Sequence, residues 1–331
     1  MKKTAVWIGL IVGLLVVILL LSILVYLIVA APQANELTLT VEPVEQVNYN
    51  NYLCYNQVDY KGNRFAWQKT SVFNTELTLL TDSGEVSELA GVSAPFQLLE
   101  DRVLSIERGV LMQRMLDSDQ AKSIADNVSS FIALEDAVLY LSDDTLMRYD
   151  WQNGNVKSLG ENIYCFFIRQ EQVYAVDADG QISSLEADGT WSKLCKLEIL
   201  GYPFRVMPLG NCVVYEHQSQ VYFADLATGD AETVALSDHR YATNIVPFIC
   251  DDTRLFVSFQ ATSADGSIVT EEEHPDNGVW FIDPQIREKK KLCDDAFDQL
   301  YLFEGNRLFG VRNNELFQID IDTGLVTQIS G

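Results

Sequence analysis

A turn that recurs along the chain constrains its fold more than any other feature. Three six-residue segments share the pattern, at 149–154 (YDWQNG), 224–229 (ADLATG) and 319–324 (IDIDTG). Glycine supplies the positive φ of a tight hairpin, and Asp or Asn side chains accept hydrogen bonds from the nearby backbone. The repeat therefore predicts a series of short antiparallel strands.

Seven such units follow from aligning the chain on the last residue of this turn. The intervals are 35, 35, 35, 40, 58 and 37 residues, and the aligned positions are Gly84, Asp119, Gly154, Gly189, Gly229, Arg287 and Gly324. Five residues after each position stands an aliphatic residue: Leu89, Ile124, Leu159, Leu194, Val234, Leu292 and Ile329. We expect these aliphatic residues to be buried on the strand that closes each unit.

The third unit shows the expected architecture of one repeat. Strand-like segments occupy 131–134, 138–142, 145–150 and 156–159. Four short strands in about 35 residues are typical of a propeller blade, and a closed ring of blades leaves only short exposed edges. The sequence predicts an all-β, seven-bladed propeller over 52–331. Six blades with one degenerate unit, or eight with a contribution from the preceding connector, remain alternatives.

The N-terminal segment predicts a membrane anchor. Residues 5–31 contain no charged side chain, Lys2 and Lys3 precede them, and the next basic residue is Lys61. The run exceeds the roughly 7–15 apolar residues of a signal peptide, which is the competing interpretation. We expect an uncleaved transmembrane helix at 5–31, residues 1–4 in the cytoplasm, a connector at 32–51 and an extracytoplasmic propeller.

The repeat and the apolar segment together resemble known propellers. The Asp-x-x-Thr-Gly turn after an aromatic-rich strand is similar to the blades of quinoprotein-like and YVTN-type propellers. The single N-terminal anchor resembles bacterial surface propellers of unknown function, including those related to the YWTD propeller of lipoprotein receptors. The Tyr-Trp-Thr-Asp tetrad and the Trp-Asp signature of WD repeats are absent. The resemblance covers about 51–331 and implies a fold without an activity.

Charge and cysteine content limit the classes of partner. The net charge is −24 at pH 7, which disfavours nucleic acid and anionic lipid surfaces and favours cationic partners. Four of the six cysteines, Cys54, Cys165, Cys212 and Cys250, lie in apolar strand-like runs. We expect mostly free, buried thiols, although an even number of cysteines outside the cytoplasm also permits disulfides.

No motif in the chain predicts a cofactor, a metal or a catalytic centre. GxSxG, HExxH, Walker A and EF-hand patterns are all missing. The leading hypothesis is a non-enzymatic binding or scaffold protein. The alternative is a cell-envelope hydrolase or lyase with carboxylates around the central opening of the propeller.

The longest connections predict where a partner binds. In a propeller, connections between strands 2 and 3 share one face with links from strand 4 to the next blade. The enlarged connections at 67–76, 237–243 and 261–277 would all lie there, as would all three histidines. The candidate binding residues are Trp67, His217, His239, Arg240, Glu271, Glu272, Glu273 and His274. We expect a protein or envelope polymer to bind this face.

Overall fold

The structure of the chain is a computed structural model. It describes residues 58–61, 64–70, 75–81, 86–90, 92, 95–118, 120–197, 206–217, 220–237, 248–250, 253–261, 274–303, 307–313 and 315–330. The chain divides into two compact units, 1–36 and 37–331. Residues 1–57 lie outside the described part, and with them the predicted transmembrane segment, the connector and Cys54. No helix long and apolar enough to cross a membrane occurs among the described residues.

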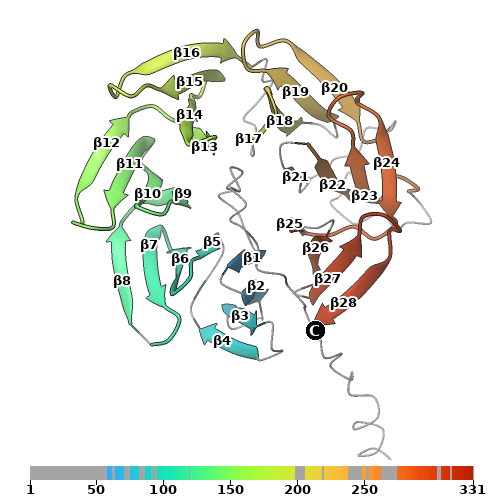
Figure 1. Cartoon of the computed structure of the whole chain (residues 1–331), viewed down its shortest axis with the longest axis horizontal. Helices are drawn as coiled ribbons and strands as arrows, with labels where there is room; N and C mark the ends of the chain where they lie inside the picture. The colour runs from blue at the N-terminus through green and yellow to red at the C-terminus, as the bar shows by residue number, and fades with distance from the viewer. Residues whose placement is uncertain are drawn as a thin grey trace, which may run out of the picture. The chain divides into compact units, whose positions relative to one another are not determined.

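Seven four-stranded antiparallel sheets form the ring in Figure 1, so the predicted all-β fold and number of blades are confirmed. Each sheet consists of four strands that are consecutive in the sequence. The first four blades are β1 (Val58–Lys61), β2 (Arg64–Thr70), β3 (Thr75–Thr81) and β4 (Val86–Ala90); β5 (Phe96–Leu98), β6 (Arg102–Glu107), β7 (Val110–Met115) and β8 (Ala121–Ala125); β9 (Val128–Ala133), β10 (Ala137–Ser142), β11 (Thr145–Asp150) and β12 (Val156–Gly160); and β13 (Cys165–Arg169), β14 (Gln172–Val176), β15 (Gln181–Leu185) and β16 (Trp191–Lys196).

The last three blades complete the ring. They are β17 (Val206–Leu209), β18 (Cys212–His217), β19 (Gln220–Asp225) and β20 (Ala231–Ala235); β21 (Phe248–Cys250), β22 (Leu255–Phe259), β23 (Gly278–Ile282) and β24 (Lys289–Cys293); and β25 (Gln299–Phe303), β26 (Arg307–Arg312), β27 (Glu315–Asp320) and β28 (Val326–Ser330). The first strand of each blade lies near the centre of the ring, and the fourth lies at its perimeter (Figure 1).

The recurring turn joins strands 3 and 4 of a blade. In blades three, five, six and seven the N–H of the aligned residue donates to the backbone carbonyl of the Asp four residues earlier. The carboxylate of the same Asp accepts two further backbone N–H bonds, as Asp320 does from Asp322 and Thr323. Arg287 has φ 60°, in the left-handed region that the glycines occupy, so the alignment placed it correctly. Gly84 and Asp119 lie outside the described residues.

The closing aliphatic residues all lie in fourth strands, but the expectation that they are buried was only partly correct. Val234 is buried, whereas Leu194 is 40% exposed. The other five are partly buried against neighbouring clusters: Leu89, Ile124, Leu159, Leu292 and Ile329. For all of these partly buried or exposed residues except Leu89, which pairs regularly with Leu77, the physical reason is a β-bulge. In blades two, three, four, six and seven the pairing of strands 3 and 4 skips this residue.

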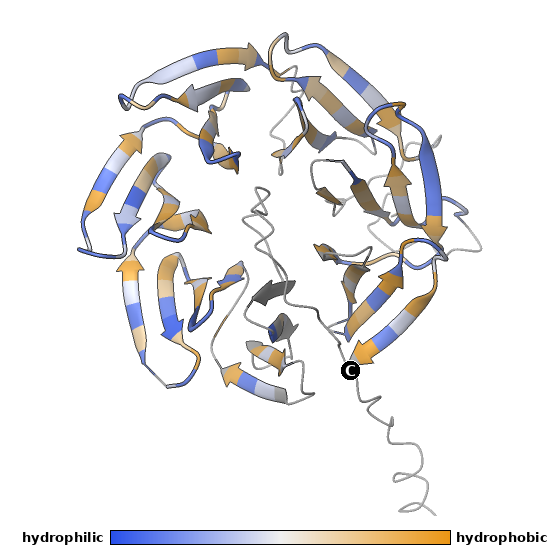
Figure 2. Cartoon of the chain, in the orientation of Figure 1, coloured by the Kyte–Doolittle hydropathy of each residue, from blue (hydrophilic) through white to orange (hydrophobic). Residues whose placement is uncertain are grey.

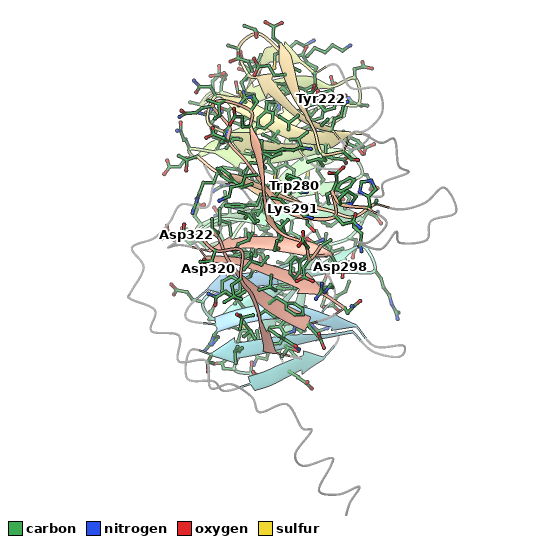
Figure 3. The ribbon with its side chains drawn as sticks, turned by 90° about the vertical axis from the view of Figure 1, so that its right-hand side faces the viewer. Tyr222, Trp280, Lys291, Asp298, Asp320 and Asp322 are labelled. Carbon is green, nitrogen blue, oxygen red and sulfur yellow. The ribbon has the colours of Figure 1, made fainter. Side chains whose placement is uncertain are left out.

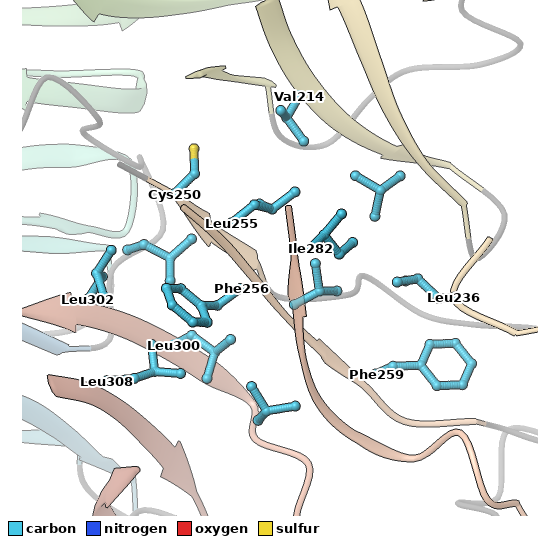
Figure 4. Close-up of a cluster of buried hydrophobic side chains, with 14 of the residues drawn as sticks. Val214, Leu236, Cys250, Leu255, Phe256, Phe259, Ile282, Leu300, Leu302 and Leu308 are labelled. Atoms are coloured by element: carbon cyan, nitrogen blue, oxygen red, sulfur yellow. The ribbon is translucent and has the colours of Figure 1, made fainter. Parts of the chain in front are cut away.

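The hydrophobic core lies between neighbouring blades. One large cluster joins blades five, six and seven, and Figure 4 shows Phe256, Leu300 and Leu308 within it. Hydrophilic residues gather on the outer strands and turns, with β24 a clear example in Figure 2. Between two neighbouring blades, Gly324 of blade seven packs so closely on blade six that an added Cβ would lie 1.9 Å from the Leu292 carbonyl oxygen. Contact between neighbouring blades therefore constrains the position of this turn as well as the packing of the core.

A candidate binding face around the insertion of blade six

The strand order separates the connections onto two faces of the ring. Turns between strands 1 and 2 and between strands 3 and 4 lie on one face, and the remaining connections lie on the other. In the side view of Figure 3, Asp320 and Asp322 stand at one edge of the disc, and Asp298, on the link before β25, stands at the other. The second face, which we call the long-connection face, carries the 18-residue segment between β22 and β23.

The structure describes the side chains of two of the eight candidate residues, Trp67 and His274. His217 is the last residue of β18, and its backbone alone is described. His239 and Arg240 come between β20 and β21 in the sequence, outside the described residues. Glu271, Glu272 and Glu273 also lie outside them. The binding role of these residues stays a prediction.

Trp67 does not lie in a connection. Strand β2 extends to Thr70, which pairs with Thr75, so the connection is shorter than the expected 67–76. The Trp67 side chain is 3% exposed and clusters with Tyr301 and Phe309 of blade seven. Its large apolar ring fills the contact between the first and last blades, so we correct its assignment from binding residue to core residue.

The two ends of the blade-six insertion are joined by a buried asparagine. The Asn277 side chain is 4% exposed, and its Oδ1 accepts a hydrogen bond of 2.7 Å from the Ala261 N–H. The Asn277 N–H in turn donates to the His274 carbonyl oxygen at 3.1 Å. These bonds satisfy backbone groups that would otherwise be buried without partners. We call residues 259–261 and 274–278 the insertion root.

His274 is fully buried in this root, whereas a loop histidine would ordinarily be solvated. Its side chain is 0% exposed, and its ring centroid lies 6.0 Å from that of Phe259. The Nδ1 atom accepts a hydrogen bond of 3.3 Å from the Asp276 N–H. The histidine acts here as a packed acceptor.

Strands β23 and β24 support the root, with Trp280 on β23 and Lys289 and Lys291 on β24. The Trp280 indole N–H donates to the Asp276 carbonyl oxygen at 2.8 Å. Lys289 and Lys291 both lie over this indole, at 4.8 and 6.0 Å from its centroid. Lys291 also donates to the Pro275 carbonyl oxygen and pairs with Asp294. Figure 3 shows Trp280 and Lys291 together. The sequence carried a signal for this support, because lysines at alternate positions of a strand point to the same side.

The exit from the root requires glycine. Gly278 has φ 134°, and a Cβ at this position would lie 2.1 Å from the Cys293 carbonyl oxygen. Burial raises the pKa of the neighbouring Cys293 thiol. Among the five described cysteines, Cys195 and Cys250 are buried as expected, whereas Cys165, Cys212 and Cys293 are only partly buried. No group of His, Cys, Asp or Glu among the described residues is arranged to hold a metal ion.

The inner strands of blades two to seven carry few titratable side chains, whereas β1 of blade one contains Asp59 and Lys61. The inner strands of blades two to seven, all described, contain no Asp or Glu. Their one charged residue is Arg169, whose guanidinium donates to Asn211 of the next blade at 3.3 Å. Phe96, Ile132, Phe166 and Met207 of these strands are buried.

Comparisons with solved structures support the fold alone. The chain is similar to PorZ, a bacterial surface component of the type-IX secretion system of Porphyromonas gingivalis, with TM-score 0.56 and 11% identity. That match covers 84% of this chain and 39% of PorZ, so the chain spans about two fifths of PorZ. An uncharacterised protein, lmo1340 of Listeria monocytogenes, matches with TM-score 0.54 and 11% identity over 87% of this chain and 97% of its own.

A designed protein shows the same level of similarity. The computationally designed Ika8 matches with TM-score 0.54 and 15% identity, over 82% of this chain and 85% of its own. No protein-family model and no curated protein sequence matches the chain. At these identities the similarity establishes a seven-bladed propeller fold and carries no activity.

Proposed function

We propose that this protein is a membrane-anchored, extracytoplasmic propeller that acts as a non-enzymatic binding or scaffold module. The observation that carries the proposal is the contrast between the inner strands of blades two to seven and a supported insertion root. The described inner strands of blades two to seven lack carboxylates. The root of the longest connection is instead held by Asn277, Trp280 and Lys291. Binding loops on a rigid scaffold concentrate function in this way.

The proposed partner is a cationic protein segment or a cation-bridged envelope polymer that binds the long-connection face. Exposed carboxylates on this face include Asp144, Glu161 and Asp298, and the insertion adds the Glu271–Glu273 run in its sequence. The opposite face is also acidic, with Glu135 and Asp322 exposed. The acidic charge therefore indicates a cationic class of partner, and the long connections indicate which face binds it.

The test is partner recovery from native membranes with the full chain as bait. One variant replaces 262–273 with a short Gly-Ser linker and keeps Ala261 and 274–277. The matched control carries Gln152→Arg and Asp322→Arg, two exposed positions on the opposite turns. We expect loss of partner from the linker variant alone. We also expect weaker recovery at about 1 M than at about 0.1 M salt, because the Debye length falls from about 10 to 3 Å.

Loss of partner from the control alone, with both proteins folded, would reverse the assignment of faces. Turnover of an envelope polymer by the purified chain would favour the hydrolase alternative. Protease added to spheroplasts tests the anchor and its orientation. It should digest the propeller, whereas a protected propeller or a mature N-terminus near Pro32 would contradict them.

A further inference from the structure

We propose that Trp280, Lys289 and Lys291 join two neighbouring connections of the long-connection face into one composite binding site for a single cationic protein segment. The first connection is the link between β20 and β21, at 236–247, and the second is the insertion of blade six. The class of ligand rests on the function proposed above. The junction between the two connections rests only on contacts of described residues.

Lys289 supports the end of the link that leaves β20. Its ammonium group donates to the carbonyl oxygens of Ala235 and Leu236, each at 2.9 Å. Leu236 is fully buried and Lys289 is half-buried, so these bonds form away from most of the solvent. A charged donor makes stronger hydrogen bonds than a neutral one. Lys289 of blade six therefore fixes the point in blade five where the link begins.

The indole of Trp280 connects this lysine to the insertion root. The Lys289 ammonium lies 4.8 Å from the centroid of the indole, within the range of a cation–π interaction. The indole N–H donates to the Asp276 carbonyl oxygen at 2.8 Å. One ring therefore contacts the support of the link through its face and the insertion root through its edge.

Lys291 extends the junction on the same side of the sheet. Residues two apart in a strand point to the same side, and Lys291 pairs with Trp280 between β24 and β23. Its ammonium group donates to the Pro275 carbonyl oxygen at 2.8 Å and lies 6.0 Å from the indole centroid. Asp294 pairs with Lys291 and offsets part of the repulsion between the two ammonium groups.

The two connections, which come from different positions in the sequence, thus begin at one support. Residues 262–273 contain one Asp, three Glu and no basic residue, whereas 236–247 contain one Asp and one Arg. This acidic charge attracts a cationic segment. Fixing the bases of both connections in advance reduces the freedom that binding must remove, so a single segment that contacts both is favoured.

The experiment is hydrogen–deuterium exchange of the full chain in detergent, measured on peptides that cover 231–237 and 274–277. Lys289→Met keeps most of the apolar side chain and removes the ammonium group. It should raise exchange in 231–237 roughly 10-fold, because charged hydrogen bonds are lost. It should also raise exchange in 274–277 roughly 2- to 5-fold, because the indole loses a cation–π contact that helps to position it.

Lys290→Met is the matched control. Lys290 lies between the two lysines on β24 and is exposed, and its substitution makes the same change of charge. It should leave exchange in both segments unchanged. Lys289→Arg keeps a cation over the ring and should retain the protection of 274–277. Strand β10 of blade three reports the stability of the whole fold and should exchange equally in all of these proteins.

An effect of Lys289→Met that is confined to 231–237 would show that the two connections are supported separately, and would overturn the junction. Equal effects of Lys289→Met and Lys290→Met would assign the change to net charge, and would also overturn it. Should β10 exchange faster in Lys289→Met as well, Lys289→Gln decides by the same comparison of 274–277, because it retains an N–H donor without the charge.

The exchange measurements involve no partner, so the junction and the binding function can fail separately. A parent protein that recovers no partner would reject the binding function and leave the junction to the exchange result. Where the parent recovers a protein partner, Lys289→Met should recover less of it than Lys290→Met. Equal recovery by these two variants would overturn the composite site, and recovery of a polymer in place of a protein would overturn the class of ligand.

Discussion

At the scale of single residues, one turn position shows how backbone conformation and packing act separately. Gly154 and Gly324 both have positive φ, at 69° and 72°. An added Cβ at Gly154 would meet only the Tyr149 hydroxyl at 3.6 Å, whereas at Gly324 it would lie 1.9 Å from the Leu292 carbonyl oxygen. The same glycine therefore satisfies a local requirement in blade three, and an additional tertiary one in blade seven.

This difference makes a matched pair of substitutions informative. Gly154→Ala should destabilise the protein by about 1 kcal/mol, because alanine is strained in the left-handed region. Gly324→Ala should cost more, by about 1–3 kcal/mol further, since the turn must also move away from blade six. Chemical denaturation of the two variants measures the difference. Equal losses of stability in the two variants would show that the turn of blade seven can move away from β24 without a further cost.

The turn aspartates give a second prediction at this scale. Backbone and side-chain hydrogen bonds from Thr323 hold the pKa of Asp320 below its ordinary value of 3.8. The Thr190 hydroxyl and N–H do the same for Asp188. A lowered pKa in the folded state means that the turns are stabilised above pH 4 and lose this stabilisation as the pH falls through the lowered value. Side-chain carboxyl NMR titration should place both midpoints below 3.8; a midpoint at or above it contradicts the turn geometry.

At the scale of secondary-structure elements, the β-bulge explains why the repeated aliphatic residue is not uniformly buried. In blade three the bulge leaves Leu159 partly buried against the cluster around Phe166. In blade four Ile182 pairs with Cys195 and the register skips Leu194, so the buried position passes to Cys195. The turn between strands 3 and 4 of blade four is also one residue tighter than those of blades three, five, six and seven, since the Gly189 N–H donates to the carbonyl of Glu186, three residues earlier. Strand register, and not hydrophobicity alone, decides which side chain enters the core.

Two leucines at the same repeat position should therefore respond differently to truncation. Leu159→Ala should destabilise the protein by about 2 kcal/mol, the lower end of the range for core leucines, because the side chain is only partly buried. Leu194→Ala should change stability by at most about 0.5 kcal/mol, as expected for an exposed residue. Urea denaturation compares them. A larger effect at Leu194 would show that the assigned register of blade four is incorrect.

At the scale of the whole molecule, the ring is closed by side-chain packing. Every described sheet consists of consecutive strands, so no described strand is shared between the first and the last blade. The cluster across this seam contains Trp67 and Leu80 from blade one with Tyr301, Phe309 and Leu316 from blade seven. Burial of these large apolar side chains holds the two ends of the repeat array together.

The seam should accordingly be sensitive to loss of its largest side chain. Trp67→Ala should cost about 3–5 kcal/mol, because a cavity forms where two blades meet. Leu325→Ala, at a position of blade seven that is 65% exposed, is the control and should be nearly neutral, within about 0.5 kcal/mol. Thermal unfolding measures both. A neutral Trp67→Ala would indicate that closure does not depend on this cluster.

The sequence by itself determined the class of fold, the seven blades, the strands of the third unit and the place of Arg287 in the recurring turn. All of these follow from interactions within a few residues: the hydrogen bonds of a turn, the sign of φ and the period of a strand. Tertiary structure decided that Trp67 closes the seam, that Cys195 replaces Leu194 in the core and that His274 is buried in the insertion root. These outcomes depend on contacts between blades, or between the ends of a long insertion. Such contacts join residues that no local pattern relates.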